Sequence, residues 1–168
     1  MSDEGYMDER EHKLAYLLQV GLDTAFGRMS EGRRVIPFAV RVAGSGAVDI
    51  YRVASEETDT PLDQLYAIVE QAMADQADAH DLQAVALVAP VQGEERVLGH
   101  GFFQAIRVHL EMPDYARLVF QPYRIDAGGE GEKSQLALGK LVPEAVGRAV
   151  FGDESGGRMV GTTLFALT

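Results

Sequence analysis

Apolar residues recur at three- and four-residue spacing in two stretches of the chain, which predicts two amphipathic helices. The first covers residues 9–26 and ends before Gly27, a residue type that favours helix ends. The second begins at Thr60-Pro61, because Thr60 can cap a helix and Pro61 suits its first position. It should continue to about residue 79, where its apolar stripe ends.

Five further stretches are apolar in alternation or continuously over a short length, as β-strands are. They are residues 34–42, 48–53, 82–91, 102–112 and 117–123. Pro37 cannot donate a hydrogen bond to a neighbouring strand, so the first stretch is an edge strand or begins after Pro37. Residues 82–91 carry no charge and are expected to form a central strand buried on both faces.

The last quarter of the chain has a weaker pattern. Residues 127–133 are glycine-rich and are expected to form a loop. Residues 141–151 are predicted to be a short helix, with Pro143 near the start and Gly152 after the end. Residues 159–167 fit either a last strand or a disordered tail, and residues 1–10 and 152–168 are candidate flexible ends.

These elements predict an α+β fold in a single domain that spans residues 1–168. The predicted order is helix, two strands, helix, three strands, helix and an optional final strand. Short connections between neighbouring strands favour a mostly antiparallel sheet of about five strands, with helices packed on it.

The strand at residues 102–112 alternates strictly from Ile106 onward, so Arg107, His109 and Glu111 share one face. Imidazole and carboxylate on one face can shuttle a proton. Arg107, with Arg117 on the next strand, could hold an anionic substrate. A polar strand face is usually solvated, however, so we favour charge pairs open to water over a ligand site.

The register of the next hairpin decides whether Arg117 joins this face. A two-residue loop sets Leu110 opposite Arg117, which mixes apolar and charged residues on one face. A three-residue loop sets Leu110 opposite Leu118 and Glu111 opposite Arg117, and we favour it because opposite charges then face each other. A register shifted by two, with His109 opposite Arg117, also keeps the faces uniform.

His100 is the remaining candidate ligand-binding residue, because Gly99 and Gly101 on either side would let the backbone approach a ligand. A bulge at the start of a strand explains the same glycines without a function, and we prefer that interpretation. No histidine pair has metal-ligand spacing, so no metal site is expected.

Composition narrows the classes of function. The 168 residues include no cysteine, which excludes disulfides, thiolate zinc sites and cysteine nucleophiles. The net charge of −11 argues against binding to nucleic acid or an anionic membrane. Phosphate-loop, dinucleotide and serine-hydrolase motifs are absent, so no cofactor is expected. A charged N-terminus without an apolar signal core makes the cytoplasm the default location.

Three strings resemble, in order and spacing, a group of small uncharacterised bacterial proteins over residues 15–125. They are residues 35–40, residues 84–88, and residues 105–111 with 119–124. Residues 97–101 depart from the pattern of that group. The resemblance implies a stand-alone cytosolic domain, and it assigns no catalytic residue because the group has no established activity.

Three hypotheses about function follow. The leading one is a non-enzymatic binding or protein-interaction domain that forms a homodimer or binds a protein partner through an open strand edge after Pro37. The first alternative is a small-molecule enzyme or sensor that uses the charged sheet face. The second alternative is an acidic, immunity-like protein that neutralises a basic partner by charge complementarity.

Overall fold

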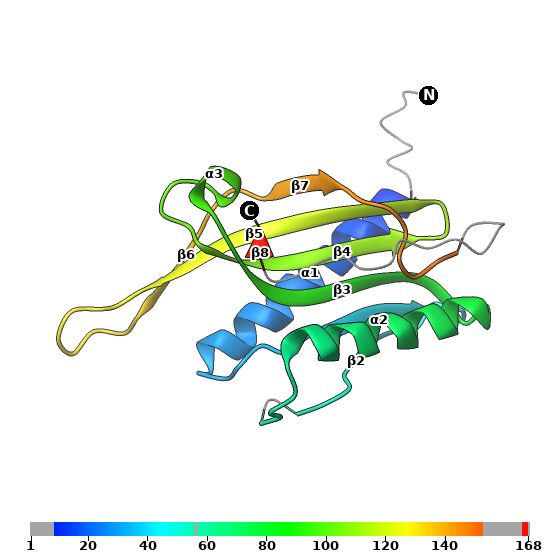
Figure 1. Cartoon of the computed structure of the whole chain (residues 1–168), viewed down its shortest axis with the longest axis horizontal. Coiled ribbons are helices and arrows are strands. Elements are labelled where there is room, and N and C mark those ends of the chain that lie inside the picture. The colour runs from blue at the N-terminus through cyan, green and yellow to red at the C-terminus, as the bar shows by residue number, and fades with distance from the viewer. Residues whose placement is uncertain (1–8, 56, 153–165, 168) are drawn as a thin grey trace.

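The computed structural model describes residues 9–55, 57–152 and 166–167 (Figure 1). The elements follow in the order α1 (Glu9–Ser30), β1 (Phe38–Ala43), β2 (Val48–Tyr51), α2 (Leu62–Asp78), β3 (Leu82–Gly93), α3 (Glu95–Leu98), β4 (Gln104–Met112), β5 (Tyr115–Asp126), β6 (Gln135–Leu138), β7 (Val142–Ala145) and β8 (Ala166–Leu167). The predicted α+β class is confirmed, with more strands than the expected five.

The strands form one sheet in the order β2-β1-β3-β4-β5-β6, in which β7 also pairs with β5 and β8 with β3. Among the described strands, every pairing is antiparallel except that of β8 with β3. The consecutive strands β3, β4 and β5 are hydrogen-bonded neighbours, as their short connections predict.

The two long helices lie on opposite faces of this sheet, with α2 in front of it and α1 behind it in Figure 1. On the α1 face, leucines of the helix pack on apolar residues of β1, β3 and β4. On the α2 face, Tyr66, Val69 and Met73 of the helix pack on β1 and β3. Both faces of β3 are therefore buried, as its uncharged sequence predicts.

The helix boundaries differ from the expectation at the end of α1 and, by one residue, at the start of α2. The first helix continues through Gly27 to Ser30, because a helical glycine costs only about 1 kcal/mol and the last turn buries Arg28. The second helix begins at Leu62, one residue later than predicted, because Pro61 stands at the cap position and not at the first helical position. Thr60 makes no side-chain cap, and its hydroxyl instead accepts a hydrogen bond from that of Thr58.

The strand after Pro37 is not at an edge of the sheet. It begins at Phe38, which confirms that Pro37 lies before the strand, but β1 then lies between β2 and β3. The expectation of an open edge on this strand is therefore wrong. The strand at that edge of the sheet is β2, because the hairpin turns outward from β1.

The helix predicted for residues 141–151 is also wrong. Its first part forms β7, which pairs with β5, and residues 146–151 then run without regular structure. A tertiary strand partner outweighs the local preference for helix here. We call residues 146–151 the strap. The last predicted strand is described only as β8, and the expectations for residues 1–8 and 153–165 lie outside the described residues.

A hairpin projects from one side of the sheet (Figure 1). It consists of the end of β5, the glycine-rich turn and β6, and we call residues 124–141 the arm. In the part of the chain that the structure describes, no helix combines the length and the apolar character that crossing a bilayer requires.

Candidate functional site

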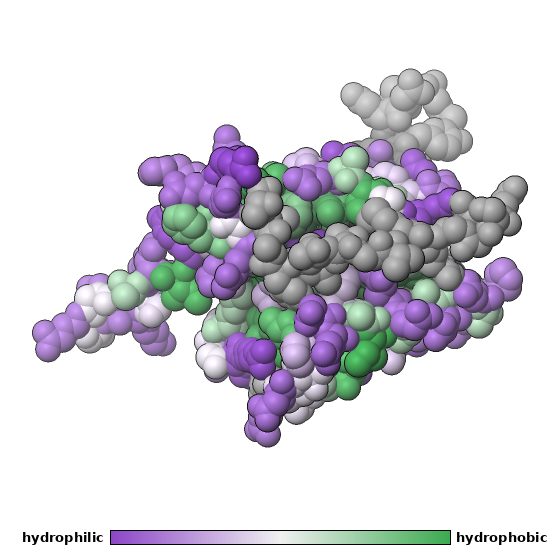
Figure 2. Space-filling model, in the orientation of Figure 1, coloured by the Kyte–Doolittle hydropathy of each residue, from purple (hydrophilic) through white to green (hydrophobic). Residues whose placement is uncertain are grey.

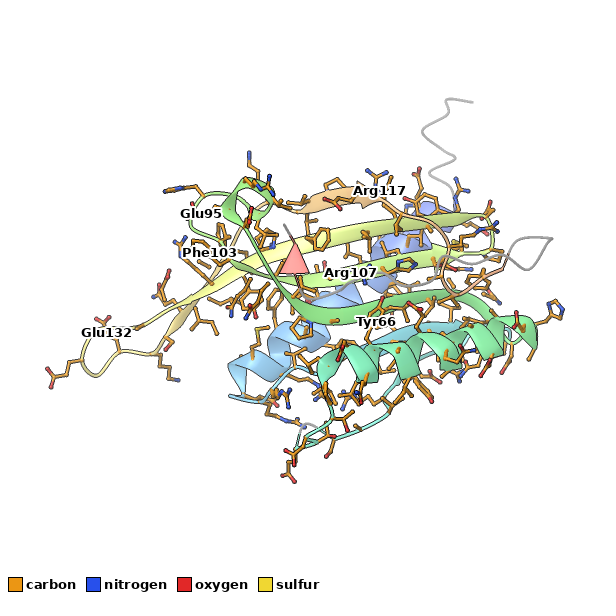
Figure 3. The ribbon with its side chains drawn as sticks, viewed as in Figure 1. Tyr66, Glu95, Phe103, Arg107, Arg117 and Glu132 are labelled. Carbon is orange, nitrogen blue, oxygen red and sulfur yellow. The ribbon has the colours of Figure 1, made fainter. Side chains whose placement is uncertain are left out.

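The alternation of β4 sends Arg107, His109 and Glu111 to one face, as predicted, and the structure shows that this is the α2 face. The three residues are only 3%, 1% and 0% exposed, however, so the interpretation of a solvated face is wrong. The helix α2 packs beside this part of β4, and the strap packs over Glu111. Figure 3 shows Arg107 on β4 and Tyr66 on α2 across from it.

The carboxylate of Glu111 is the centre of this buried cluster. Its Oε1 accepts a hydrogen bond from the backbone N–H of Ala149 at 2.6 Å. Its Oε2 accepts from the N–H of Val150 at 2.8 Å and from that of Phe151. Nε2 of His109 lies 2.7 Å from Oε1 and acts as the donor, since a carboxylate can only accept. Glu111 thus anchors three consecutive amides of the strap to β4.

Arg107 is held by the side chain of Tyr66. Its Nη1 donates to the tyrosine hydroxyl at 2.9 Å, and its guanidinium carbon lies 5.5 Å from the ring centroid, within cation–π range. Burial raises the pKa of Tyr66 to about 12, although the charge of Arg107 acts in the opposite direction. The hydroxyl therefore stays protonated and remains a neutral acceptor for Arg107.

Glu70 lies one helical turn after Tyr66, and its carboxyl group interacts with the charges of His109, Arg107 and Glu111. Burial raises the pKa of Glu70, and the neighbouring charges of His109 and Arg107 only partly offset that shift. In this cluster of Tyr66, Glu70, Arg107, His109 and Glu111, Arg107 binds Tyr66 and His109 binds Glu111, and Glu70 interacts with the charges of His109, Arg107 and Glu111. Both oxygens of Glu111 are engaged by the protein itself, so the arrangement supports the strap rather than a bound substrate.

Arg117 does not join this face. The hairpin has the two-residue loop, which sets Leu110 opposite Arg117 and His109 opposite Leu118, so the favoured register is wrong. Arg117 is on the α1 face and exposed. The face rule failed because the α2 face combines charged residues of β4 with Leu118 and Phe120, which are buried beside them.

His100 is fully exposed and belongs to neither face. His100 stands in the connection between α3 and β4, and its Nδ1 lies 3.1 Å from Oε2 of Glu95, the first residue of α3. The expected strand bulge is absent from this segment, because β4 begins only at Gln104. Gly99 and Gly101 both have positive φ, which explains why the turn contains two glycines.

Sequence reasoning missed Tyr66, Glu70 and the strap as parts of the β4 cluster. Tyr66 stands in the predicted apolar stripe of α2, and Glu70 follows it by four positions on the same side of the helix. That spacing was a signal for a polar contact within the core. The sequence could not show which strand these two side chains contact, because the packing of α2 beside β4 depends on the order of the strands in the sheet.

The arm carries a second candidate site, an apolar face that its own chain leaves open. Ile125, Leu136 and Leu138 are 56%, 42% and 53% exposed. Ile125 pairs with Leu136, and Leu138 pairs with Tyr123 of the α1-face core, so all three point to the α1 face. The helix α1 ends at Ser30 and leaves these side chains exposed.

A groove of about 620 Å³ lies between the end of α1 and the arm, lined by Phe26 and Met29 on one side and Ile125 and Leu136 on the other. We call these four residues, together with Leu138, the arm surface. Figure 2 shows apolar side chains where the arm joins the body and polar side chains at its tip. Ser30, Glu132, Lys133 and Ser134 complete the lining. A groove of this size with both apolar and polar walls is suited to a side chain or a segment of a partner.

Two other cavities are smaller. One of about 380 Å³ lies between the start of α2 and the end of β3, and Tyr123 is among its lining residues. One of about 300 Å³ is lined by Arg28, Arg33 and Arg52, with Glu57 in the same wall. Within the described ranges, no three histidine or carboxylate side chains gather as a metal site would require.

Comparisons with known proteins identify no relative of this chain. No protein-family model matches the sequence. No curated protein and no solved structure is significantly similar to it. The resemblance to small bacterial proteins stays a prediction, and the inference of function rests on the residues themselves.

Proposed function

We propose that this chain is a protein-interaction domain that binds its partner through the arm surface. The observation that carries the proposal is the exposed apolar face of the arm, where Ile125, Leu136 and Leu138 are each more than 40% exposed. Large apolar side chains gathered on one projecting hairpin are unfavourable in water, and such patches typically mark interaction sites.

The backbone of β6 supports the same conclusion. In the sheet order, β6 is the terminal strand on its side, so one row of its N–H and C=O groups faces away from β5. An extended segment of a partner can pair with such an edge through main-chain hydrogen bonds. Leu136 and Leu138 would supply the apolar contacts beside that pairing.

The hypothesis of an enzyme or sensor at β4 has less support, because a substrate would have to displace the strap from Glu111. The hypothesis of an immunity-like protein rests on the net charge and the small size of the chain. A cytoplasmic, bacterial setting is part of the present proposal, on the basis of the resemblance to stand-alone cytosolic domains.

Site-specific photo-crosslinking tests the proposal. A photoreactive residue is placed at Leu138 in the arm and, as a matched control, at Ile68 of α2, which is 50% exposed against 53% for Leu138. In an extract of its native cells, we expect a discrete adduct from position 138 and none from position 68. The absence of an adduct at 138, or equal adducts from both positions, would contradict the proposal.

A further inference from the structure

We propose that the partner is a second copy of this chain, paired β6 to β6 about a two-fold axis at Leu136. This inference rests on the proposed function, because it names the occupant of the arm surface. A two-fold interface uses the same residues from both copies, so one exposed strand with an open edge is sufficient to form it.

Charge favours the arm as the place where two copies meet. Each chain carries a net charge of −11, so two copies repel each other over most of their surfaces. The arm is neutral, since Asp126, Glu130 and Glu132 are balanced by three basic residues, Arg124, Lys133 and Lys140. Contact through the arm therefore brings the two chains together at a segment without net charge.

The apolar positions of β6 suit antiparallel pairing with itself. Opposed residues in an antiparallel pair share a face, so Leu136 and Leu138 of both copies would form one apolar row on the α1 face. That row is continuous with the groove beside Phe26 and Met29. Pairing thus places the leucines of the second copy beside those of the arm and satisfies the open backbone edge in one step.

Two registers keep the leucines of both copies on the same face. A register centred on Leu136 sets Leu136 opposite its copy and brings Glu132 opposite Lys140 on each side of the axis. A register centred on Ala137 sets Leu136 opposite Leu138 but leaves Lys140 opposite an uncharged residue, Ser134. The first register sets Leu138 opposite Ser134 and so has one leucine pair where the second has two, but it gains two Glu132–Lys140 pairs, and we favour it for those charges. At the β4–β5 hairpin, by contrast, deep burial outweighed a charge pair.

Light scattering on the full-length chain after size exclusion tests this inference. At about 100 µM, where a dimer with a micromolar dissociation constant is populated, we expect a mass twice the 18.3 kDa of the chain. Leu136→Glu places two carboxylates at the axis and should give a monomer. Ile50→Glu on β2, the opposite edge strand, is the matched control at 39% exposure and should leave the dimer intact.

Charge reversal tests the register. Glu132→Lys and Lys140→Glu should each raise the dissociation constant by about tenfold, because two ion pairs become two like-charge contacts. The double variant Glu132→Lys/Lys140→Glu should restore the wild-type value. These residues are exposed, so circular dichroism should show an unchanged fold. Single variants with wild-type affinity would overturn the inference.

The outcomes separate this inference from the proposed function. A monomer at every concentration, together with a crosslink from Leu138 to a different protein, would overturn the second copy and leave an interaction domain. A monomer without any crosslink from Leu138 would overturn both. A dimer that Ile50→Glu disrupts and Leu136→Glu does not would place the interface at β2 and overturn the inference.

Discussion

His109 and Glu111 stand two positions apart on β4 and lean toward each other, with Nε2 of the imidazole 2.7 Å from Oε1 of the carboxylate. An imidazole–carboxylate pair of this kind often orients a proton-transfer group in an enzyme. Here the pair is closed to solvent, and the carboxylate also receives three backbone N–H groups of the strap. The Glu111 carboxylate, held by His109, therefore fixes the path of the chain after β7.

Removal of the Glu111 carboxylate should release the strap. We expect Glu111→Ala to lower the free energy of unfolding by about 3–5 kcal/mol, because it leaves buried donors without their acceptor. Urea unfolding measures the loss, and amide exchange at residues 149–151 should accelerate. Glu144→Gln on β7, where the side chain is exposed, is the control. An equal, small effect of both substitutions would show that Glu111 does not anchor the strap.

Tyr66 should make the fold sensitive to alkali. Its pKa is about 12 in the folded chain against 10.0 for an ordinary tyrosine, so the folded state keeps a proton that the unfolded state releases. The resulting stability is fully present below pH 10 and is lost as the pH rises toward 12. Denaturant unfolding across this range should show that loss in the wild type.

The Tyr66→Phe variant separates this contribution from other alkaline effects. It lacks the titrating hydroxyl, so its stability should fall less steeply between pH 10 and 12. At neutral pH it should be less stable by about 1–3 kcal/mol, because Arg107 loses its acceptor. Tyr16→Phe on the exposed side of α1 should match the wild type at both ends of the range. Parallel pH profiles for the wild type and Tyr66→Phe would count against the assignment.

Glu70 should destabilise the fold at neutral pH. Burial raises its pKa, so the folded state binds the proton more readily than the unfolded state does. Stability should therefore rise as the pH falls through the range in which Glu70 becomes protonated. Glu70→Gln should be more stable than the wild type at pH 7, and the difference should disappear in acid. Thermal unfolding at several pH values measures it, with Glu11→Gln on the exposed side of α1 as control.

Gly21 and Gly27 of α1 should respond to alanine in opposite directions. A Cβ at position 21 would lie 2.9 Å from Cγ2 of Val88, whose β-branched side chain has little freedom to move. The overlap costs about 1–3 kcal/mol, which exceeds the gain of about 1 kcal/mol in helix propensity. A Cβ at position 27 meets nothing within 4 Å among the described residues, so Gly27→Ala should stabilise by about 1 kcal/mol.

Chemical unfolding of both variants measures the two effects in one helix. The free energy of unfolding should fall in Gly21→Ala and rise in Gly27→Ala, each relative to the wild type. Stabilisation by both substitutions would mean that α1 can move away from β3 without loss of packing.

The sequence alone determined most of the local structure. The spacing of apolar residues located both long helices and the strands from β1 to β5, because 3.6-residue and two-residue periods reflect which side of an element is buried. Alternation also placed Arg107, His109 and Glu111 on a common face. Of the arm, only the loop at residues 127–133 was predicted. The strand β6 has only four residues, too few for a clear alternation of apolar and polar positions.

Only the tertiary structure decided what covers each face. Glu111 meets amides 38–40 positions away in the chain, and Arg107 meets a tyrosine 41 positions away. No local period encodes contacts at such separations, because they depend on the order of the strands and on the return path of the chain. The same limit explains the hairpin register, which followed from the burial of Leu118 and Phe120 beneath distant segments rather than from the charges of Glu111 and Arg117.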